Sequence, residues 1–168
     1  IKETMKKHKW ILIENLLSEK RDLRKRYSYV CRKGFLKIKD ICKMKKVNWS
    51  YIALIDADVV LKKNHFKELI REFDKNPKLG LASGRTYYKE NNQLIIEKIP
   101  KYFAAGPVRL WRKKCFIETD MYKITYCPDS VSCVKSMLNG WETRNFNHIK
   151  SLHRRTSSTE GLWKGYVI

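Results

Sequence analysis

The sequence is short of acidic residues. Its 168 residues include 17 Asp and Glu against 37 Lys and Arg, which gives a formal net charge of +20 at pH 7. A field of this sign attracts polyanions such as nucleic acid, anionic lipid headgroups or phosphate-bearing substrates, without distinguishing between them. The hydrophobic fraction of 43% is typical of a folded chain and argues against disorder. The composition therefore predicts one globular domain with a basic surface.

Paired cysteines and long apolar runs are also lacking. The five cysteines are odd in number and include no C-x-x-C pair, which argues against a disulfide framework or a zinc ribbon. The same usage favours a reducing compartment. No run approaches the roughly 20 apolar residues that a membrane span needs. We therefore expect a cytoplasmic protein whose positive charge would suit peripheral contact with an anionic membrane surface.

Two carboxylates follow an uncharged segment in the middle of the chain. Residues 51–55, "YIALI", predict a buried strand, and Asp56 and Asp58 come directly after it. Ligands bind at the carboxyl ends of strands in α/β sheets, and carboxylates there suit Mg²⁺ or Mn²⁺ shared with substrate phosphates. The alternative is a solvated turn, because a D-x-D pattern alone is weak. A helix should follow, capped by Asn64, with an apolar stripe of Phe66, Leu69, Ile70 and Phe73.

The remaining segments alternate between helical and extended patterns. A helix is expected after Gly34, with Phe35, Ile38, Ile41 and Cys42 at helical spacing. Strands are expected at 79–88 and 92–99 around an Asn-Asn turn, within 104–116, and at 143–153. This alternation predicts an α/β fold with a mostly parallel central sheet.

The segment "PDSVSCVKSMLNG" predicts a helix that begins after Pro128 and stops at Gly140. We expect Asp129 or Ser130 as its N-cap, and Val131, Val134 and Leu138 on its buried face. Capping alone would explain Asp129. A carboxylate at a helix start is also stabilised in its ionised form, which suits a general base.

A few other residues are candidates for binding, although each also has an ordinary structural explanation. His153 could be a surface histidine unless Asp58 lies near it. Arg154 and Arg155 are natural phosphate partners, but an exposed basic edge is the default. Trp111 and Trp141 are core or rim residues by default, and Trp141 could line a sugar or acceptor site by stacking.

Two stretches together resemble the family 2 glycosyltransferases of the GT-A fold. These are "ALIDADVVLKKNHFKELIREF" (53–73) and "PDSVSCVKSMLNGWETRNFNHIKSLHRRTSS" (128–158). In that family an acidic pair opens a helix, and a Gly-Trp or Gly-Tyr pair ends it eleven residues after the second acid. Here the spacing from Asp129 to Gly140 is 140 − 129 = 11 residues. Pro128 replaces the first acid of the pair, which departs from the pattern.

The resemblance implies a role for each candidate. Asp56 and Asp58 take the Asp-x-Asp positions, with Asp58 and His153 on the metal side and Asp56 toward the donor, and Asp129 takes the position of the catalytic base. A further stretch, "RKGFLKIKDI" from Arg32, resembles the family segment before the Asp-x-Asp that helps hold the nucleotide diphosphate. The implied donor-binding residues are Arg32, Gly34, Asp56, Arg154 and Arg155, and the implied acceptor-side residues are Trp111 and Trp141. The implied fold is a three-layer sandwich with a mostly parallel central sheet.

The resemblance does not extend to the front of the sequence. The family begins with a strand and a Pro-Ala-Tyr-Asn-like loop that holds the nucleotide base, and the printed sequence contains no such segment. We therefore expect a single partial GT-A domain over 1–168, incomplete at its N-terminal side. Residues 1–60 would be the remainder of the nucleotide-binding half up to the Asp-x-Asp, and 61–168 the acceptor-side half. Part of the nucleotide pocket would then be absent, so activity of this fragment alone is an open question.

The expected function is transfer of a sugar from a nucleotide-diphosphate donor to a hydroxyl of a glycan, lipid-linked or other acceptor. The expected reaction is inverting and depends on Mg²⁺ or Mn²⁺. One alternative is a basic nucleic-acid-binding module without catalysis, although the densest basic stretch, 21–26, contains no aromatic residue. Another is a nucleotidyltransferase, which also uses paired acids. We expect no specific nucleic-acid partner.

Overall fold

The structure is a computed structural model that describes His8 and residues 23–154. Its strands form one six-stranded mixed sheet in the order β1-β5-β3-β6-β2, and β4 pairs with β3 off this path. The strands are β1 (Tyr51–Ile55), β2 (Val59–Leu61), β3 (Leu79–Glu90), β4 (Gln93–Ile96), β5 (Val108–Arg112) and β6 (Glu142–His153). The helices of this part are α2 (Leu23–Met44), α3 (His65–Lys75), α4 (Lys113–Glu118) and α5 (Pro128–Leu138).

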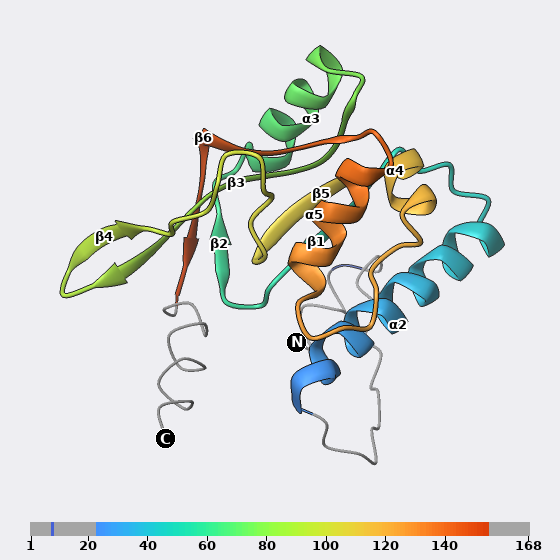
Figure 1. Ribbon diagram of the computed structural model, residues 1–168, viewed down its shortest axis with the longest axis horizontal. Helices are drawn as coiled ribbons and strands as arrows, with labels where there is room; N and C mark the ends of the chain where they lie inside the picture. Colours follow the sequence, from blue (N-terminus) through green and yellow to red (C-terminus); the bar gives the residue numbers. More distant parts are fainter. Residues whose placement is uncertain (1–7, 9–22, 155–168) are drawn as a thin grey trace.

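Helices cover both faces of the sheet, as a three-layer arrangement requires. Figure 1 shows α3 on one side of the sheet, and α2, α4 and α5 on the other. The core on the α2 side consists of Phe35, Ile52, Leu81, Ala104, Trp111, Cys115, Phe116, Tyr122 and Cys133. The core on the α3 side consists of Leu69, Phe73, Leu79, Ala82, Leu110 and Ile149. The mixed α/β class is therefore confirmed.

The expectation of a mostly parallel sheet is wrong for the described strands. Only β3 and β6 run parallel; the other pairs, β1–β5, β2–β6, β3–β4 and β3–β5, are antiparallel. One cause is the turn at Asn91 and Asn92, whose φ angles of 47° and 60° fit the tight turn of a hairpin. The other is that β2 and β3, which flank α3, are not neighbours in the sheet, so this helix does not connect adjacent parallel strands.

Helix α2 begins earlier than expected. The sequence predicted a helix only from Gly34, whereas the helix already begins at Leu23 and Gly34 lies in its interior. The first turns are rich in Lys and Arg, which form helices well but leave little apolar periodicity to detect. A stripe of Tyr27, Cys31 and Phe35 at intervals of four residues is the signal that predicts the longer helix.

The buried face of α5 also differs from the expected one. Leu138 is 81% exposed and Val134 is exposed, whereas the buried residues are Pro128, Ser132, Cys133 and Ser136. The small polar side chains find partners inside the protein. Ser132 Oγ accepts a 2.7 Å hydrogen bond from Arg109, and the Ser136 hydroxyl donates to the Ser132 carbonyl at 2.8 Å. Hydrophobic periodicity therefore selected the wrong face.

Most of the other expected elements are confirmed, but the strand expected to run to residue 116 ends at Arg112, and helix α4 follows it directly. Strand β1 has the expected bounds, and α3 buries Leu69 and Phe73 from its predicted stripe. Asn64 is the N-cap of α3, but no side-chain hydrogen bond caps this helix; the Asn64 carbonyl accepts from the Glu68 amide at 2.9 Å. Within residues 23–154, no helix is long and apolar enough to cross a lipid bilayer.

Candidate functional site

Asp56 and Asp58 lie in the short connection between β1 and β2, and His153 ends β6. The pairing of β2 with β6 places Val59 opposite His153. The histidine therefore lies next to Asp58, the residue before Val59. Nε2 of His153 is 3.2 Å from Oδ1 of Asp58, and the Arg154 amide donates to the Asp58 carbonyl at 2.9 Å. The structure thus joins these residues, which lie about a hundred positions apart in the sequence.

These three residues form a group that suits a divalent cation. One ligand atom from each of Asp56, Asp58 and His153 lies within 4.8 Å of the others, and all three side chains are half-buried. Two carboxylate oxygens and an imidazole nitrogen are acceptable ligands for Mn²⁺ or Mg²⁺. The donor set therefore fits the metal expected from the sequence.

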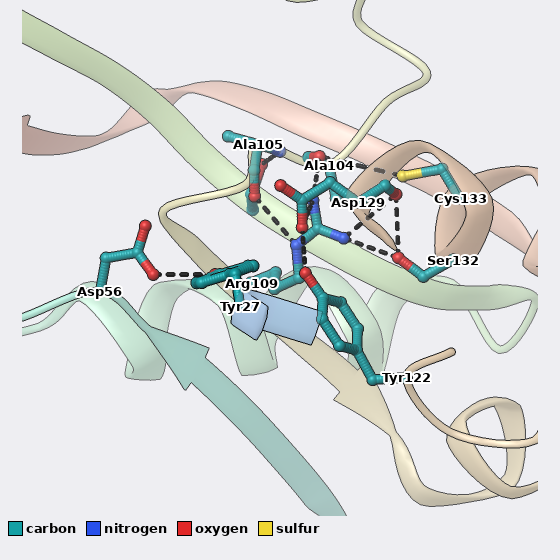
Figure 2. A network of polar contacts seen from close by, with 10 residues as sticks. Tyr27, Asp56, Ala104, Ala105, Arg109, Tyr122, Asp129, Ser132 and Cys133 are labelled. Carbon is teal, nitrogen blue, oxygen red and sulfur yellow. Dashed lines mark hydrogen bonds and ion pairs between the residues drawn. The ribbon is translucent and has the colours of Figure 1, made fainter. Parts of the chain in front are cut away.

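A tyrosine that the sequence analysis missed orients Asp56. The hydroxyl of Tyr27, from α2, donates to Oδ1 of Asp56 at 2.9 Å (Figure 2). The pKa of Asp56 is raised by burial and further by the negative charges of Asp129 and Asp58, while the Tyr27 hydrogen bond opposes the rise. A cation bound beside Asp56 would offset both the burial of its carboxylate and the repulsion from the neighbouring acids.

Asp129 lies in the first turn of α5, but it is not the N-cap. Cys127 occupies that position and Pro128 opens the helix, so the expected capping hydrogen bond is absent from this helix. The carboxylate is instead held from the side. Its Oδ1 accepts a 2.6 Å hydrogen bond from the Tyr122 hydroxyl and lies 3.2 Å from Nη2 of Arg109 (Figure 2).

Arg109 fixes the position of Asp129 from within the core. Its side chain is fully buried on β5 and donates to the carbonyls of Ala104 and Ala105, to the Asp129 carbonyl and to Ser132 Oγ. These contacts tie the 104–105 loop to the start of α5. An arginine inside the apolar strand "VRLWR" is the sequence signal that points to this role, because buried charges are rare unless paired.

The loop beside Asp129 has a glycine where a side chain would crowd the carboxylate. A Cβ atom built on Gly106 would lie 2.5 Å from Oδ2 of Asp129, closer than such contacts allow. The next residue, Pro107, accepts a 2.9 Å hydrogen bond from the Asp56 amide through its carbonyl. One short loop therefore contacts both the aspartate that follows β1 and the aspartate on α5.

The other predicted donor residues do not all gather at this site. Arg32 is engaged elsewhere: its guanidinium donates to the carbonyls of Asp120 and Tyr122 and pairs with the Asp120 carboxylate at 3.3 Å. Gly34 faces open space on α2. Arg154 is exposed beside His153. Arg155 lies outside the described residues.

The two tryptophans lie away from the site surface. Trp111 is 1% exposed and sits in the core beneath Arg109, whose guanidinium carbon is 5.5 Å from the ring centroid. Trp141 follows α5 at the end opposite Asp129, and its indole donates to Glu118 at 2.8 Å. At 1.5 Å per residue, the helix from Asp129 to its last residue, Leu138, is about 14 Å long. The structure therefore brings neither ring to Asp129.

Comparison with known protein families agrees with this arrangement. The model of glycosyl transferase family 2 matches residues 42–148, which include the Asp-x-Asp segment and the Asp129 helix. The chain belongs to this family. A search of curated proteins found no significant match. Membership implies a transferase that takes a nucleotide-sugar donor and an acceptor. His153 lies outside the matched segment, so its place in the family 2 site depends on geometry alone.

Proposed function

We propose that this family 2 domain transfers a sugar from a nucleoside-diphosphate donor to an acceptor hydroxyl, with inversion at the anomeric carbon. The supporting observation is that two different acidic arrangements meet at one place. Asp56, Asp58 and His153 form a group suited to a cation. Asp129, held by Arg109 and Tyr122, is close enough to Asp56 to raise the pKa of its carboxyl.

Asp58 and His153 would hold Mg²⁺ or Mn²⁺, with Asp56 beside them toward the donor. When bound, the cation would neutralise charge on the diphosphate and make it a better leaving group. The exposed Arg154 follows His153 directly, and with Arg155 it could contact the same phosphates. Tyr27 would keep the Asp56 carboxylate turned toward this group through its 2.9 Å hydrogen bond.

Asp129 would act as the general base. Its Oδ1 is already engaged by Tyr122 and Arg109, which leaves Oδ2 to accept the proton of the acceptor hydroxyl. The proton would move to Oδ2 as the hydroxyl oxygen bonds to the anomeric carbon and the bond to the diphosphate breaks. In a direct displacement the base and the leaving group would act on opposite sides of the sugar, and Asp129 is a separate group from the residues that would hold the cation.

The two alternative functions account for less of this arrangement. A nucleic-acid-binding module has no need for a histidine, two acids and a separately held carboxylate in one place. A nucleotidyltransferase would use the acid group but would leave the contacts among Asp129, Arg109 and Tyr122 unexplained. The acceptor in this proposal is any hydroxyl compound, including a lipid-linked one, for which the basic surface would suit an anionic membrane.

Nucleotide binding tests this proposal. Titration calorimetry with UDP-sugars and GDP-sugars should detect binding that needs Mn²⁺ or Mg²⁺, and Asp58→Asn should abolish both the binding and the metal requirement. Asp74→Asn is the matched control, because Asp74 is an exposed acid on α3 outside the metal group. Metal-independent binding of equal strength in Asp58→Asn would contradict the assignment.

A further inference from the structure

Glu97, the first residue after β4, points toward the site from an unexpected direction. Its amide donates to the Thr86 carbonyl at 3.0 Å, which continues the β3–β4 pairing by one residue. Its neighbours Ile96 and Lys98 line an open cavity together with Arg85 and Tyr87. Since side chains alternate along a strand, Glu97 points to the opposite face.

That opposite face carries His153. Thr86 pairs with Ser151 across β3 and β6, and Tyr88 pairs with His153 two residues further along. Opposite residues on paired strands share a face, so Glu97, Thr86 and Ser151 form a row across three strands. The row lies about 7 Å along β6 from His153, from a rise of about 3.3 Å per residue.

The oxygens of this row have no hydrogen-bond partner among the described residues. They are Glu97 Oε2, Thr86 Oγ1 and Ser151 Oγ, and all three atoms are buried. Thr86 is 1% exposed and Ser151 is 4% exposed. Thr86 and Ser151 therefore give Glu97 a polar lining without fixing its carboxyl through a hydrogen bond. A buried carboxyl without a fixed partner costs stability, and such groups cluster at functional sites.

Glu97 lies within electrostatic range of both halves of the site. Burial raises the pKa of Glu97, the nearby His153 lowers it, and Asp129 and Asp56 raise it further. The charges of His153 and Asp56 in the metal group, and that of Asp129, therefore all act on the Glu97 carboxyl. It is nonetheless absent from the group of residues whose ligand atoms lie within 4.8 Å of one another. Glu97 thus lies on the same face as His153 and within electrostatic range of Asp129, without belonging to the metal group.

In a direct displacement, the space between the metal group and Asp129 would hold the transferred sugar. The base, the anomeric carbon and the leaving diphosphate must be nearly in line, so the sugar ring lies between Asp129 and the cation that binds the diphosphate. A carboxylate beside a sugar ring accepts hydrogen bonds from its hydroxyls. Sites that hydrogen-bond a substrate hydroxyl discriminate strongly against analogues that lack it.

We propose that Glu97 hydrogen-bonds hydroxyl groups of the donor sugar and determines which sugar is accepted, with Thr86 and Ser151 as its polar lining. This inference rests on the proposed glycosyl transfer. It adds a sugar-binding carboxylate that is separate from both the metal group and the base.

The test compares sugar nucleotides with the corresponding free nucleoside diphosphates. Calorimetry in Mn²⁺ would use UDP-glucose, UDP-N-acetylglucosamine and GDP-mannose against UDP and GDP. In Glu97→Gln, the affinity for the tightest sugar nucleotide should fall by about tenfold or more relative to its diphosphate, because a charged hydrogen bond is lost. Affinity for the diphosphate itself should stay unchanged. Glu90→Gln, an exposed acid of the same hairpin, is the matched control and should change neither affinity.

Two further variants extend the test. Glu97→Asp shortens the side chain and should give the same selective loss even if Glu97→Gln folds poorly. Thr86→Val should give a smaller loss of the same kind. If Glu97→Gln weakens binding of UDP and of Mn²⁺ as much as binding of the sugar nucleotide, Glu97 belongs to the metal group and the inference is wrong. If the ratio of the sugar-nucleotide affinity to the diphosphate affinity does not change, Glu97 has only a structural role and the inference is also wrong. If the unmodified protein binds no nucleotide at all in Mn²⁺, the proposed function fails and this inference fails with it.

Discussion

The hydroxyl of Tyr122 is 2.6 Å from Oδ1 of Asp129, and the tyrosine ring is buried in the core on the α2 side of the sheet. The pKa of the Tyr122 phenol is raised by burial and by the negative charge of Asp129, so the phenol stays protonated and donates to the carboxylate. Its ring packs edge-on against Phe35 and Trp111. The orientation of Asp129 is therefore tied to the core.

Removing the Tyr122 hydroxyl should slow transfer without disrupting the fold. Tyr122→Phe keeps the packed ring and loses one hydrogen bond, which should lower the free energy of unfolding by about 1 kcal/mol. Asp129 keeps Arg109 but loses its second constraint, so we expect a several-fold lower kcat with an unchanged KM for the donor. Tyr27→Phe is the matched comparison, because it removes the hydroxyl that holds Asp56 instead. It should raise the donor KM; equal effects of both variants on kcat would count against separate roles.

Asp129→Asn separates the base from its structural contacts. Transfer should fall by about 10²–10⁴-fold, the usual contribution of a general base, while donor binding persists. The structure also changes the expected effect on stability, since Asp129 does not cap α5 and its side chain is 40% exposed. The loss of its pairing with Arg109 should cost more than the roughly 1 kcal/mol of an exposed pair and less than the about 3–5 kcal/mol of a buried one. Kinetics and denaturant unfolding together measure this, and transfer within a few-fold of the unmodified protein would place the base elsewhere.

The candidate metal group and the candidate base have local signals in the sequence. An uncharged strand followed by Asp56 and Asp58 is visible in the sequence, and so is a helix start at Pro128 with Asp129 beside it. The meeting of His153 with Asp58 was proposed from family resemblance, and the β2–β6 register brings it about. That register depends on strand pairing, which spacing alone does not reveal.

The missed residues depend on tertiary contacts. Tyr27 reaches Asp56 only because α2 begins three turns earlier than its apolar pattern indicates. Tyr122 lies in an irregular segment between α4 and α5, where no periodicity marks a functional side chain. The antiparallel direction of most strands was not predicted for the same reason. Strands β1 and β5 pair although three other strands lie between them along the chain.

Gly106→Ala should impair catalysis through a single methyl group. The added Cβ would lie 2.5 Å from Oδ2 of Asp129, so either the loop or the carboxylate must move. We expect transfer to fall by tenfold or more, with Mn²⁺ binding retained, as a displacement near 1 Å at a reacting group costs about 10²-fold. Calorimetry and initial rates would measure the two effects.

Gly34→Ala is the control for that substitution. Gly34 lies inside α2, and a Cβ atom added to it would meet nothing within 4 Å, so alanine should raise stability by up to about 1 kcal/mol through helix propensity. It should leave donor binding intact. A loss of donor affinity in Gly34→Ala would restore the donor-binding role that the sequence resemblance implied for this residue. If Gly106→Ala transfers sugar at the normal rate, the present position of Asp129 Oδ2 is not needed for catalysis.

The metal-free protein should become less stable as pH rises through the range in which Glu97 ionises. The pKa of Glu97 is higher in the folded than in the unfolded chain, chiefly because of burial, with His153 lowering it and Asp129 and Asp56 raising it. A raised folded pKa contributes stability that is complete below the unfolded pKa, about 4.3, and is lost as pH rises through the folded value. Glutamine does not ionise, so the stability of Glu97→Gln lacks this dependence on pH. The variant should therefore match the parent near pH 4 and melt at a higher temperature near pH 7, as thermal unfolding without metal would measure. Parallel melting curves for the two proteins across this range would show that the Glu97 carboxyl is not held in the buried, repulsive environment described here.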